Sequence, residues 1–373
     1  MRLKIAVLIA KFAAFLSKKI LRKSGETISG RVLLALYPRA ITELSKGKKI
    51  ICVSGTNGKT STTKALVSII SKLGTVATSP SGSNLERGVA AALMHKTDFA
   101  VLEVDELHLS RVIEEAKPKA VLLLNLTRDQ LHRMHEVKRV ADRWAKSAVS
   151  APETLFIGDV DDPFVALALS NAAQSKKISF GGRKHQDGAV CPSCGKYLKW
   201  VRNNYKCSCG LTNSNADEIF ESGSAAFRNA TMANVAGKFF GARPIAINEK
   251  SLERSVDQIH KGVKANIRLT KNPASWTEAL ESVTGENAVL IVNSREVDGI
   301  DTSWLWDISF SGLFGKRIVV CGERALDIAY RLHVEGIEAE ITSNFKEAIA
   351  KFESGSSVHV LAAYTAFHEL VNS

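Results

Sequence analysis

The segment from Ile50 to Leu66 constrains the fold of this chain more than any other stretch. It reads IICVSGTNGKTSTTKAL, in which an apolar run enters a loop of small residues and a helix-forming stretch follows. Small residues let backbone N–H groups close around phosphate oxygens, and the N-terminus of a helix adds partial positive charge. A strand, a loop and a helix in this order therefore predict an α/β fold that binds nucleotide phosphates at the loop.

The two residues that end the loop carry the predicted chemistry. Lys59 is expected to lie on the β- and γ-phosphates, and the hydroxyl of Thr60 is expected to bind Mg²⁺. The loop departs from the common G-x-x-x-x-G-K-[ST] pattern, because Val53 stands five residues before Gly58. A turn that binds nothing is the alternative, and the flanking strand and helix argue against it. The predicted nucleotide-binding residues of the loop are Gly55, Thr56, Asn57, Gly58, Lys59, Thr60 and Ser61.

Apolar runs alternate with helix-like segments along the rest of the chain, which favours βαβ units and a mostly parallel sheet. The first predicted strands are Ile50–Ser54, Phe99–Val104, Ala120–Asn125 and Thr154–Ile157, and the first predicted helices are Ser61–Leu73, Ser110–Ala116, Val137–Val149 and Ala230–Phe240. A second α/β region is predicted from near Lys250. Its predicted strands are Ala288–Asn293, Arg317–Cys321, Glu338–Thr342 and Val358–Ala362, and its predicted helices are Trp276–Val283, Ala325–Glu335 and Phe345–Phe352.

Four of the six cysteines fall within nineteen residues, as a C-x₂-C pair and a C-x-C pair. Four thiolates on two tight turns suit a closed tetrahedral site for structural Zn²⁺, and two chance pairs of inert thiols are the alternative. Cys52 and Cys321 stand in apolar runs that read as buried strands, so the pattern is not a disulfide framework. The predicted zinc ligands are Cys191, Cys194, Cys207 and Cys209.

The net positive charge of the chain favours an anionic partner but does not identify it. Lysine and arginine exceed aspartate and glutamate by 50 − 38, a net charge of +12, which suits nucleotides, nucleic acid or an anionic membrane. Trp200 and Tyr205, with the basic residues around them, are expected to give the cysteine-containing insert a basic, aromatic surface. A nucleic-acid-binding ATPase is therefore one alternative function, and steep salt dependence of binding would support it. A zinc ribbon inside an enzyme is more often structural, so no nucleic acid is expected.

The N-terminal stretch MRLKIAVLIAKFAAFLSKKILRK is basic and apolar, and Lys11 interrupts its apolar run. Lys4, Lys11 and Lys18 are seven residues apart and share one helical face. The stretch is too short and too charged to span a bilayer. Three interpretations stay open: an amphipathic helix packed on the next domain, a helix that also touches anionic lipid, and a cleaved signal peptide.

Several segments occur in the same order as in a known family. The GTNGKT loop resembles that of Mur ligases and folylpolyglutamate synthases, and the whole chain resembles the MurT family of amidating Mur-type ligases. VLEVDELHLS places Glu103 where the family's Mg²⁺-binding glutamate stands, with Asp105 and Glu106 behind the metal or at the surface. SGSNLERG places Asn84 near the nucleotide and metal. FRNATMANVAGKFFGA aligns Asn229 and Asn234 with nucleotide contacts, and NLTRDQLHRMHE matches the family at Asn125, Arg128, Asp129 and Gln130.

The resemblance implies a Mur-ligase-type central P-loop ATPase domain with an inserted zinc ribbon, followed by a Rossmann-like α/β C-terminal domain. The expected boundaries are a helical arm at residues 1–45, the central domain at 46–249 with its ribbon at about 188–213, and a MurT-type C-terminal domain at 250–373. About fifty residues precede the phosphate loop. The UDP-sugar-binding domain of full Mur ligases is therefore expected to be absent, which agrees with a substrate that is already lipid-linked.

The resemblance also implies an activity. It is the ATP-dependent amidation of the D-glutamate α-carboxyl of the lipid II stem peptide to D-isoglutamine, through an acyl phosphate, at Lys59 and Glu103 with Mg²⁺. Ammonia would come from a GatD-like glutaminase subunit in a heterodimer, because no cysteine of this chain stands in a nucleophile-like context. The enzyme would work in the cytoplasm, at the inner face of the membrane. The alternative is a Mur-like or folylpolyglutamate-like ligase that adds an amino acid without a glutaminase partner.

The segment VDGIDTSWLWDISF resembles part of the family's C-terminal domain, from which an aspartate orients the catalytic histidine of the partner. An Asp–His contact of this kind fixes the tautomer and the ring orientation. Asp307 is the first candidate for this role and Asp301 the second, and Asp298 belongs to the same acidic cluster. The alternative is that these aspartates cap turns while Trp304 and Trp306 pack in the core.

Overall fold

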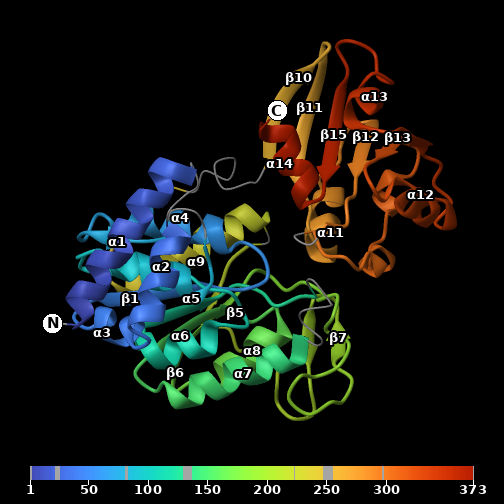
Figure 1. The fold of residues 1–373 in the computed structure, drawn as a ribbon. Helices are drawn as coiled ribbons and strands as arrows, with labels where there is room; N and C mark the ends of the chain where they lie inside the picture. The colour runs from blue at the N-terminus through green and yellow to red at the C-terminus, as the bar shows by residue number, and fades with distance from the viewer. Residues whose placement is uncertain are drawn as a thin grey trace. The chain divides into compact units, whose positions relative to one another are not determined.

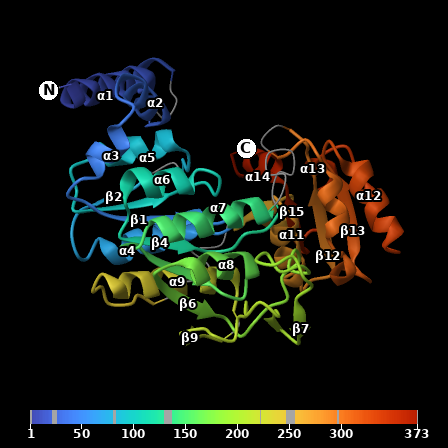
Figure 2. The same cartoon turned by 90° about the horizontal axis from the view of Figure 1, so that it is seen from below.

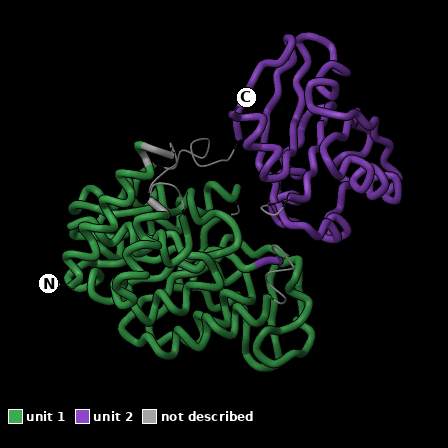
Figure 3. Tube along the Cα trace, viewed as in Figure 1, with its two compact units in different colours: residues 1–126, 137–253 green, residues 127–136, 254–373 purple. Residues whose placement is uncertain are grey.

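The structure is a computed structural model that describes residues 2–21, 26–79, 83–128, 137–221, 223–246, 255–295 and 298–372. The chain forms two compact units (Figure 3), residues 1–126 with 137–253 and residues 127–136 with 254–373. Each unit is built around its own sheet.

A parallel sheet of seven strands organises the first unit, in the order β2-β3-β1-β4-β5-β6-β9 (Figures 1 and 2). The central strand β1 pairs with β3 on one side and with β4 on the other, so the loop that follows β1 lies at the carboxyl edge of the sheet. The strands are β1 (Lys49–Ser54), β2 (Val76–Ala77), β3 (Phe99–Glu103), β4 (Ala120–Leu123), β5 (Leu155–Asp159), β6 (Gln174–Ser179) and β9 (Glu218–Ile219).

Helices cover both faces of this sheet. On one face, α4 (Lys59–Ile70) and α9 (Ala225–Phe239) pack on alternate residues of the strands, such as Ile51 and Leu122. The other face carries α5, α6, α7 and α8, each of which lies in the connection between two successive parallel strands. Their bounds are α5 (Glu86–Leu93), α6 (Leu109–Ala116), α7 (Val137–Ser150) and α8 (Pro163–Asn171).

Three helices precede β1 and form the N-terminal arm: α1 (Arg2–Leu21), α2 (Glu26–Leu36) and α3 (Ala40–Ser45). Helix α1 lies beside α2, and α2 lies on α5 (Figure 2). The contact between α2 and α5 is close, because a methyl group added at Gly30 would lie 1.7 Å from the carbonyl oxygen of Arg87. The arm is therefore attached to the domain through backbone-to-backbone packing. Among the residues described, no helix combines the length and the apolar character needed to cross a membrane.

The second unit contains a six-stranded sheet in the order β10-β11-β15-β12-β13-β14, in which only β10 and β11 are antiparallel. Its strands are β10 (Ser255–His260), β11 (Val263–Leu269), β12 (Asn287–Ile291), β13 (Arg317–Cys321), β14 (Glu340–Ile341) and β15 (Ser357–Ala362). Its helices are α11 (Pro273–Glu281), the 3₁₀ helices η1 (Ser303–Asp307) and η2 (Ser311–Leu313), α12 (Ala325–Val334), α13 (Phe345–Ile349) and α14 (Tyr364–Asn372).

Two hydrophobic cores fill this second unit, one on each face of the sheet. Trp276 of α11 and Ile328 of α12 pack on one face, while Ile349 of α13 and Phe367 of α14 pack on the other. Strand residues alternate between the two cores, as Val289 and Leu290 do. The unit is therefore a three-layer α/β sandwich, as predicted from the alternation of strands and helices.

The predicted elements lie at their expected places with shifted ends, and several elements were not predicted. Helix α8 carries a clear start signal that was overlooked, since Asp162 caps it with Pro163 at its first turn. The hairpin β10–β11 was also overlooked, although polar and apolar residues alternate along it as they do in a half-buried strand. Cys52 and Cys321 are buried in strands, as predicted, and burial raises the pKa of each thiol to about 12.

Candidate active site and metal centre

The phosphate loop contains two glycines with positive φ, a backbone conformation that residues with a side chain rarely adopt. Gly55 has φ of 146° and Gly58 has φ of 86°, both in the range that L-residues rarely adopt. A methyl group at Gly58 would lie 2.5 Å from Oδ1 of Asn229, so the loop packs directly against α9. Helix α4 starts at Lys59, which directs its N-terminal N–H groups toward the loop.

Lys59 is buried at the start of α4 and is held by oxygen atoms. Its ammonium donates to the carbonyl of Gly55 at 2.5 Å and lies 2.9 Å from Oε2 of Glu106. Burial lowers the pKa of Lys59, but attraction to Glu106, with Asp105 and Glu103 further off, outweighs burial and the net shift is upward. Lys59 therefore stays protonated at the position where a phosphate would need a cation.

From the sequence, Glu106 was expected to lie either behind the Mg²⁺ ligands or at the protein surface. Its side chain is only 5% exposed and forms the ion pair with Lys59. The backbone carbonyl of Glu106 also accepts a hydrogen bond from Nε1 of Trp144 at 3.1 Å, which ties this segment to α7. No local pattern in the sequence predicts this ion pair, because its two members stand forty-seven positions apart.

Thr60 and Glu103 meet at the carboxyl edge of the sheet. The Thr60 hydroxyl lies 2.9 Å from Oε2 and 3.2 Å from Oε1 of Glu103, which ends strand β3 and is buried. Two ligands at right angles around Mg²⁺, each about 2.1 Å from the ion, lie about 3 Å apart. The two side chains offer the hard oxygen atoms that Mg²⁺ prefers, at the spacing that two neighbouring ligands need.

Asn84 and Asp105 lie next to this pair through backbone contacts. The N–H of Asp105 donates to the carbonyl of Asn84 at 2.8 Å, and the Asp105 carboxylate accepts from the N–H of Leu107. The chain segment that carries Asn84 is therefore joined to the segment that follows Glu103. This places the predicted residue beside the proposed metal ligands.

Asn125 holds the loop and belongs to the segment NLTRDQLHRMHE. Its carbonyl accepts from the N–H of Thr56, its Oδ1 accepts from the N–H of Asn57, and its Nδ2 donates to the carbonyl of Asn57, all at 2.9–3.0 Å. Strand β4 thus fixes the loop that follows β1. Asp129 and Gln130, matched in the same segment, lie outside the described residues.

The two asparagines of α9 differ in their surroundings. Asn229 lies against the loop at Gly58, and its contact with a nucleotide stays a prediction. The amide of Asn234 instead bonds in both directions to the backbone of Ile245, at 2.9 and 3.1 Å. The structure brings Asn229 to the loop and uses Asn234 to hold the chain that follows α9.

The four clustered cysteines converge on one point. Their Sγ atoms all lie within 4.8 Å of one another, with 3.6 Å between Cys191 and Cys209 and 3.4 Å between Cys194 and Cys207. Tetrahedral zinc with Zn–S bonds of about 2.3 Å places its sulfurs about 3.8 Å apart. The donor set and its spacing fit Zn²⁺. The turns end in Gly195 and Gly210, both with positive φ.

A short hairpin, β7 (Lys199–Val201) with β8 (Asn204–Lys206), separates the two cysteine pairs. Tyr205 does not contribute to an aromatic surface, which corrects the prediction: it is 1% exposed and its hydroxyl donates to the carbonyl of Val160 at 2.9 Å. Asn213, near the end of the insert, donates to Asp161 at 3.0 Å. The buried ring of Tyr205 and its hydroxyl therefore fasten the insert to the segment that follows strand β5.

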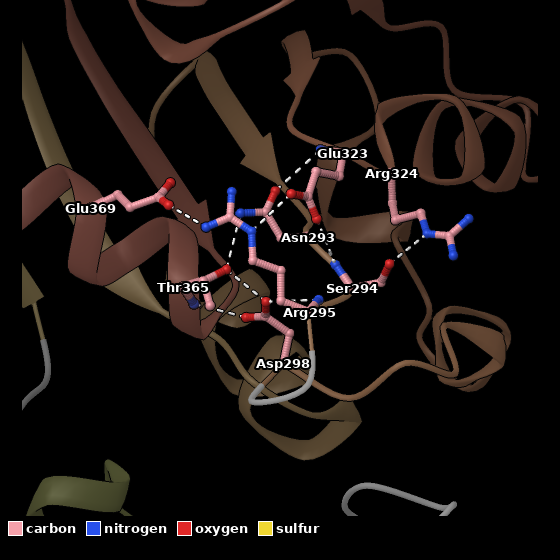
Figure 4. A network of polar contacts seen from close by, with 8 residues as sticks. All are labelled: Asn293, Ser294, Arg295, Asp298, Glu323, Arg324, Thr365 and Glu369. Atoms are coloured by element: carbon pink, nitrogen blue, oxygen red, sulfur yellow. Dashed lines mark hydrogen bonds and ion pairs between the residues drawn. The ribbon is translucent and has the colours of Figure 1, made fainter.

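In the second unit, a polar network gathers where β12, β13 and β15 end (Figure 4). Asp298 accepts from the N–H of Thr365 at 2.7 Å and from its hydroxyl at 2.6 Å, and so caps the start of α14. Arg295 bonds to Glu323 at 2.8 Å and also to Glu369. Asp298 is 6% exposed, so it is a capping residue of this unit, the alternative that the sequence left open for it.

Asp301 precedes the 3₁₀ helix η1 and Asp307 is its last residue, and both are exposed. Asp301 accepts from the N–H of Ser303 at 2.8 Å, and Asp307 lies 3.1 Å from the guanidinium of Arg128, which groups with the second unit. Of the two tryptophans that one alternative placed in the core, only one is buried. Trp304 is buried against Trp276, whereas Trp306 is 55% exposed.

Comparison with known proteins agrees with this description. The Mur ligase middle domain family matches residues 53–221, and the MurT ligase C-terminal family matches residues 269–367. The solved structure of MurF from Acinetobacter baumannii superposes with a TM-score of 0.63 at 17% identity, over 92% of this chain and 81% of that one. Residues 53–221 are therefore a Mur ligase middle domain with the phosphate loop after its central strand, and the fold of the chain is that of the Mur ligases.

Over most of its length, the chain is also similar to proteins named MurT. The lipid II isoglutaminyl synthase (glutamine-hydrolyzing) subunit MurT of Streptococcus pneumoniae is 29% identical over 94% of this chain and 93% of its own length. The protein of the same name from Staphylococcus aureus is 27% identical over 91% of this chain and 90% of its own length. The chain therefore combines a Mur ligase middle domain with the C-terminal domain of the MurT ligases.

Proposed function

We propose that this chain is the ATP-using subunit of a lipid II isoglutaminyl synthase. It would convert the D-glutamate α-carboxyl of the lipid II stem peptide into the amide of D-isoglutamine, in the cytoplasm at the inner face of the membrane. The observation that carries the proposal is the convergence of Lys59, Thr60 and Glu103 at one loop, in a chain whose C-terminal domain matches MurT.

The residues of the loop have distinct roles in this reaction. The ammonium of Lys59 would turn from Glu106 toward the phosphates, or contact both at once. There it would neutralise the charge that develops on the transferring phosphoryl group of ATP. Thr60 and Glu103 would hold Mg²⁺, which when bound neutralises phosphate charge and orients the reacting oxygens. The loop N–H groups and Asn229 would position the nucleotide, together with Gly55, Thr56, Asn57, Gly58, Ser61 and Asn84. The acyl phosphate would then react with ammonia, releasing phosphate and leaving an amide.

Ammonia would come from a GatD-like glutaminase subunit, in keeping with the name of the relatives. Exposed apolar side chains beside Asp307 support a protein partner at this surface. Trp306 is 55% exposed, and Tyr330, whose ring packs against it at 6.3 Å, is 62% exposed. An exposed aromatic cluster next to a carboxylate suits a protein interface better than open solvent. Asp307, with Asp301 as the second candidate, would orient the catalytic histidine of the partner.

Zinc would have a structural role in this enzyme. The four cysteines supply a complete tetrahedral set, so the ion would have no open position for a substrate. The expected domain division is the helical arm at residues 1–45, the ATP-binding domain at 46–249 with its ribbon, and the MurT-type domain at 250–373.

Offering the purified chain different nitrogen donors tests the proposed reaction. The chain is incubated with lipid II, ATP and Mg²⁺, and with either a high concentration of ammonium or a mixture of amino acids. Mass spectrometry of the product should show an amide in place of a carboxyl with ammonium, and no added residue with amino acids. Addition of an amino acid would instead establish the folylpolyglutamate-like or Mur-like alternative.

A further inference from the structure

Helix α1 turns its large apolar side chains outward. Leu8 is 73% exposed, Phe12 is 61% exposed and Phe15 is 58% exposed. At 100° per residue these side chains fall on one arc of the helix, with neighbours of the same kind. We call this set the α1 stripe; it consists of Ile5, Leu8, Ile9, Phe12, Phe15 and Leu16, each at least 38% exposed.

The opposite face of α1 is the one that packs on the protein. Ala6, Ala10 and Ser17 are at most 5% exposed, and they lie on the side that meets α2. A helix that served only to cover the domain would bury its largest apolar residues and expose its small ones. The arrangement in α1 is the reverse, so the described residues of the first unit leave the α1 stripe uncovered.

Basic residues border the α1 stripe, and the helix has no acidic residue. Lys4 and Lys11 are exposed and follow one edge of the stripe, and Arg2 stands at the other edge near the helix start. Lys19 is exposed at the far end, with its ammonium 5.9 Å from the centre of the Phe15 ring. An apolar arc bordered by lysines suits a surface that is apolar inside and anionic at its edge.

We propose that α1 lies in the plane of an anionic phospholipid surface, with the α1 stripe among the acyl chains and its lysines at the headgroups. The inference rests on the proposed function, because a lipid-linked substrate requires the enzyme to work at a membrane. A second copy of this chain is the other candidate occupant. It is disfavoured because two such helices would bring their lysines together with no carboxylate on either.

Vesicle sedimentation tests the proposal with the full chain, without ATP or lipid II. Phosphatidylglycerol–phosphatidylcholine vesicles should retain the wild-type chain, and pure phosphatidylcholine vesicles should retain much less. Phe12→Glu should weaken binding to the anionic vesicles by about tenfold or more. The matched control is Ile259→Glu, which puts the same charge on an equally apolar position that is 73% exposed on β10. Its binding should equal that of the wild type.

A second pair of variants separates charge from apolar contact. Lys4→Ala with Lys11→Ala should weaken binding to anionic vesicles, whereas Lys72→Ala with Lys96→Ala, exposed elsewhere on the same unit, should not. Equal binding of wild type and Phe12→Glu overturns the proposal. So does a wild-type chain that stays in solution and forms a dimer which Phe12→Glu dissociates. Amidation of detergent-solubilised lipid II should survive Phe12→Glu, so loss of membrane binding and failure of the proposed reaction are told apart.

Discussion

Lys59 and Glu106 bury opposite charges together beside the phosphate loop, with side chains 9% and 5% exposed. Removing one member of a buried pair leaves the other charge uncompensated, at a cost of about 3–5 kcal/mol. Lys59→Met should therefore lose catalysis by about a hundredfold or more and also lower the free energy of unfolding. Chemical denaturation and turnover at saturating ATP measure the two effects.

The double variant Lys59→Met with Glu106→Gln is the control for this prediction. It removes both charges, so it should recover most of the lost stability and none of the activity. Wild-type turnover in Lys59→Met at saturating ATP would remove Lys59 from the proposed chemistry.

Thr60 offers a second test at the residue scale. Thr60→Val removes the hydroxyl that faces Glu103 and keeps the shape, so the Mg²⁺ concentration that gives half-maximal activity should rise by about tenfold. Thr62→Val on the same helix is the matched control, because its buried hydroxyl has no hydrogen-bond partner. An unchanged Mg²⁺ dependence in Thr60→Val would exclude the hydroxyl as a ligand.

At the scale of elements, the packing of the N-terminal arm on α5 requires a glycine at position 30. An alanine within a helix gains about 0.5–1 kcal/mol over glycine, but the added methyl at Gly30 meets the backbone of α5 at 1.7 Å. Overpacking of this kind costs about 1–3 kcal/mol, so Gly30→Ala should loosen α2 and speed proteolysis of the arm. Arg31→Ala, exposed on the same helix, should leave proteolysis unchanged. Equal proteolysis of both variants would contradict the close contact.

The cysteine-containing insert should hold a zinc ion that the rest of the domain does not need for ATP binding. The purified chain should contain one Zn²⁺ per molecule, and Cys207→Ser should lose the ion and expose the insert to protease. The variant should bind ATP as the wild type does, because the phosphate loop is formed by β1, β4 and α4. Cys321→Ser, in a strand of the second unit, should keep its zinc. A zinc-free wild-type chain of normal stability would rule the site out.

Local sequence patterns predicted the elements that carry their own signals. The phosphate loop, Glu103 at a strand end and the paired cysteines need only neighbours in sequence, so their places were predicted. The hydrogen bonds between Asn125 and the phosphate loop, and the ion pair between Lys59 and Glu106, depend on which strands become neighbours. No local sequence pattern contains that information. In the same way, the periodicity of α1 reveals an apolar stripe but not whether the stripe faces inward.

For the whole molecule, three aspartates in one short segment have different surroundings. Asp298 is buried as the cap of α14, while Asp301, before η1, and Asp307, its last residue, are exposed. Asp307→Asn should remove glutamine-driven amidation, by about four orders of magnitude if its geometry resembles a catalytic triad, and keep ammonium-driven amidation. Asp298→Asn should lower stability and affect both donors alike. If Asp307→Asn and Asp301→Asn both keep full glutamine-driven activity, neither aspartate serves the partner.

Isotope transfer tests the central claim most directly. The chain is combined with a GatD-like glutaminase, the proposed partner, and supplied with lipid II, ATP, Mg²⁺ and glutamine labelled with ¹⁵N in its side-chain amide. The account predicts ¹⁵N in the α-amide of D-isoglutamine, with one ATP hydrolysed for each amide formed. A product that carries an added amino acid, or lipid II that keeps its free α-carboxyl while ATP is consumed, would contradict it.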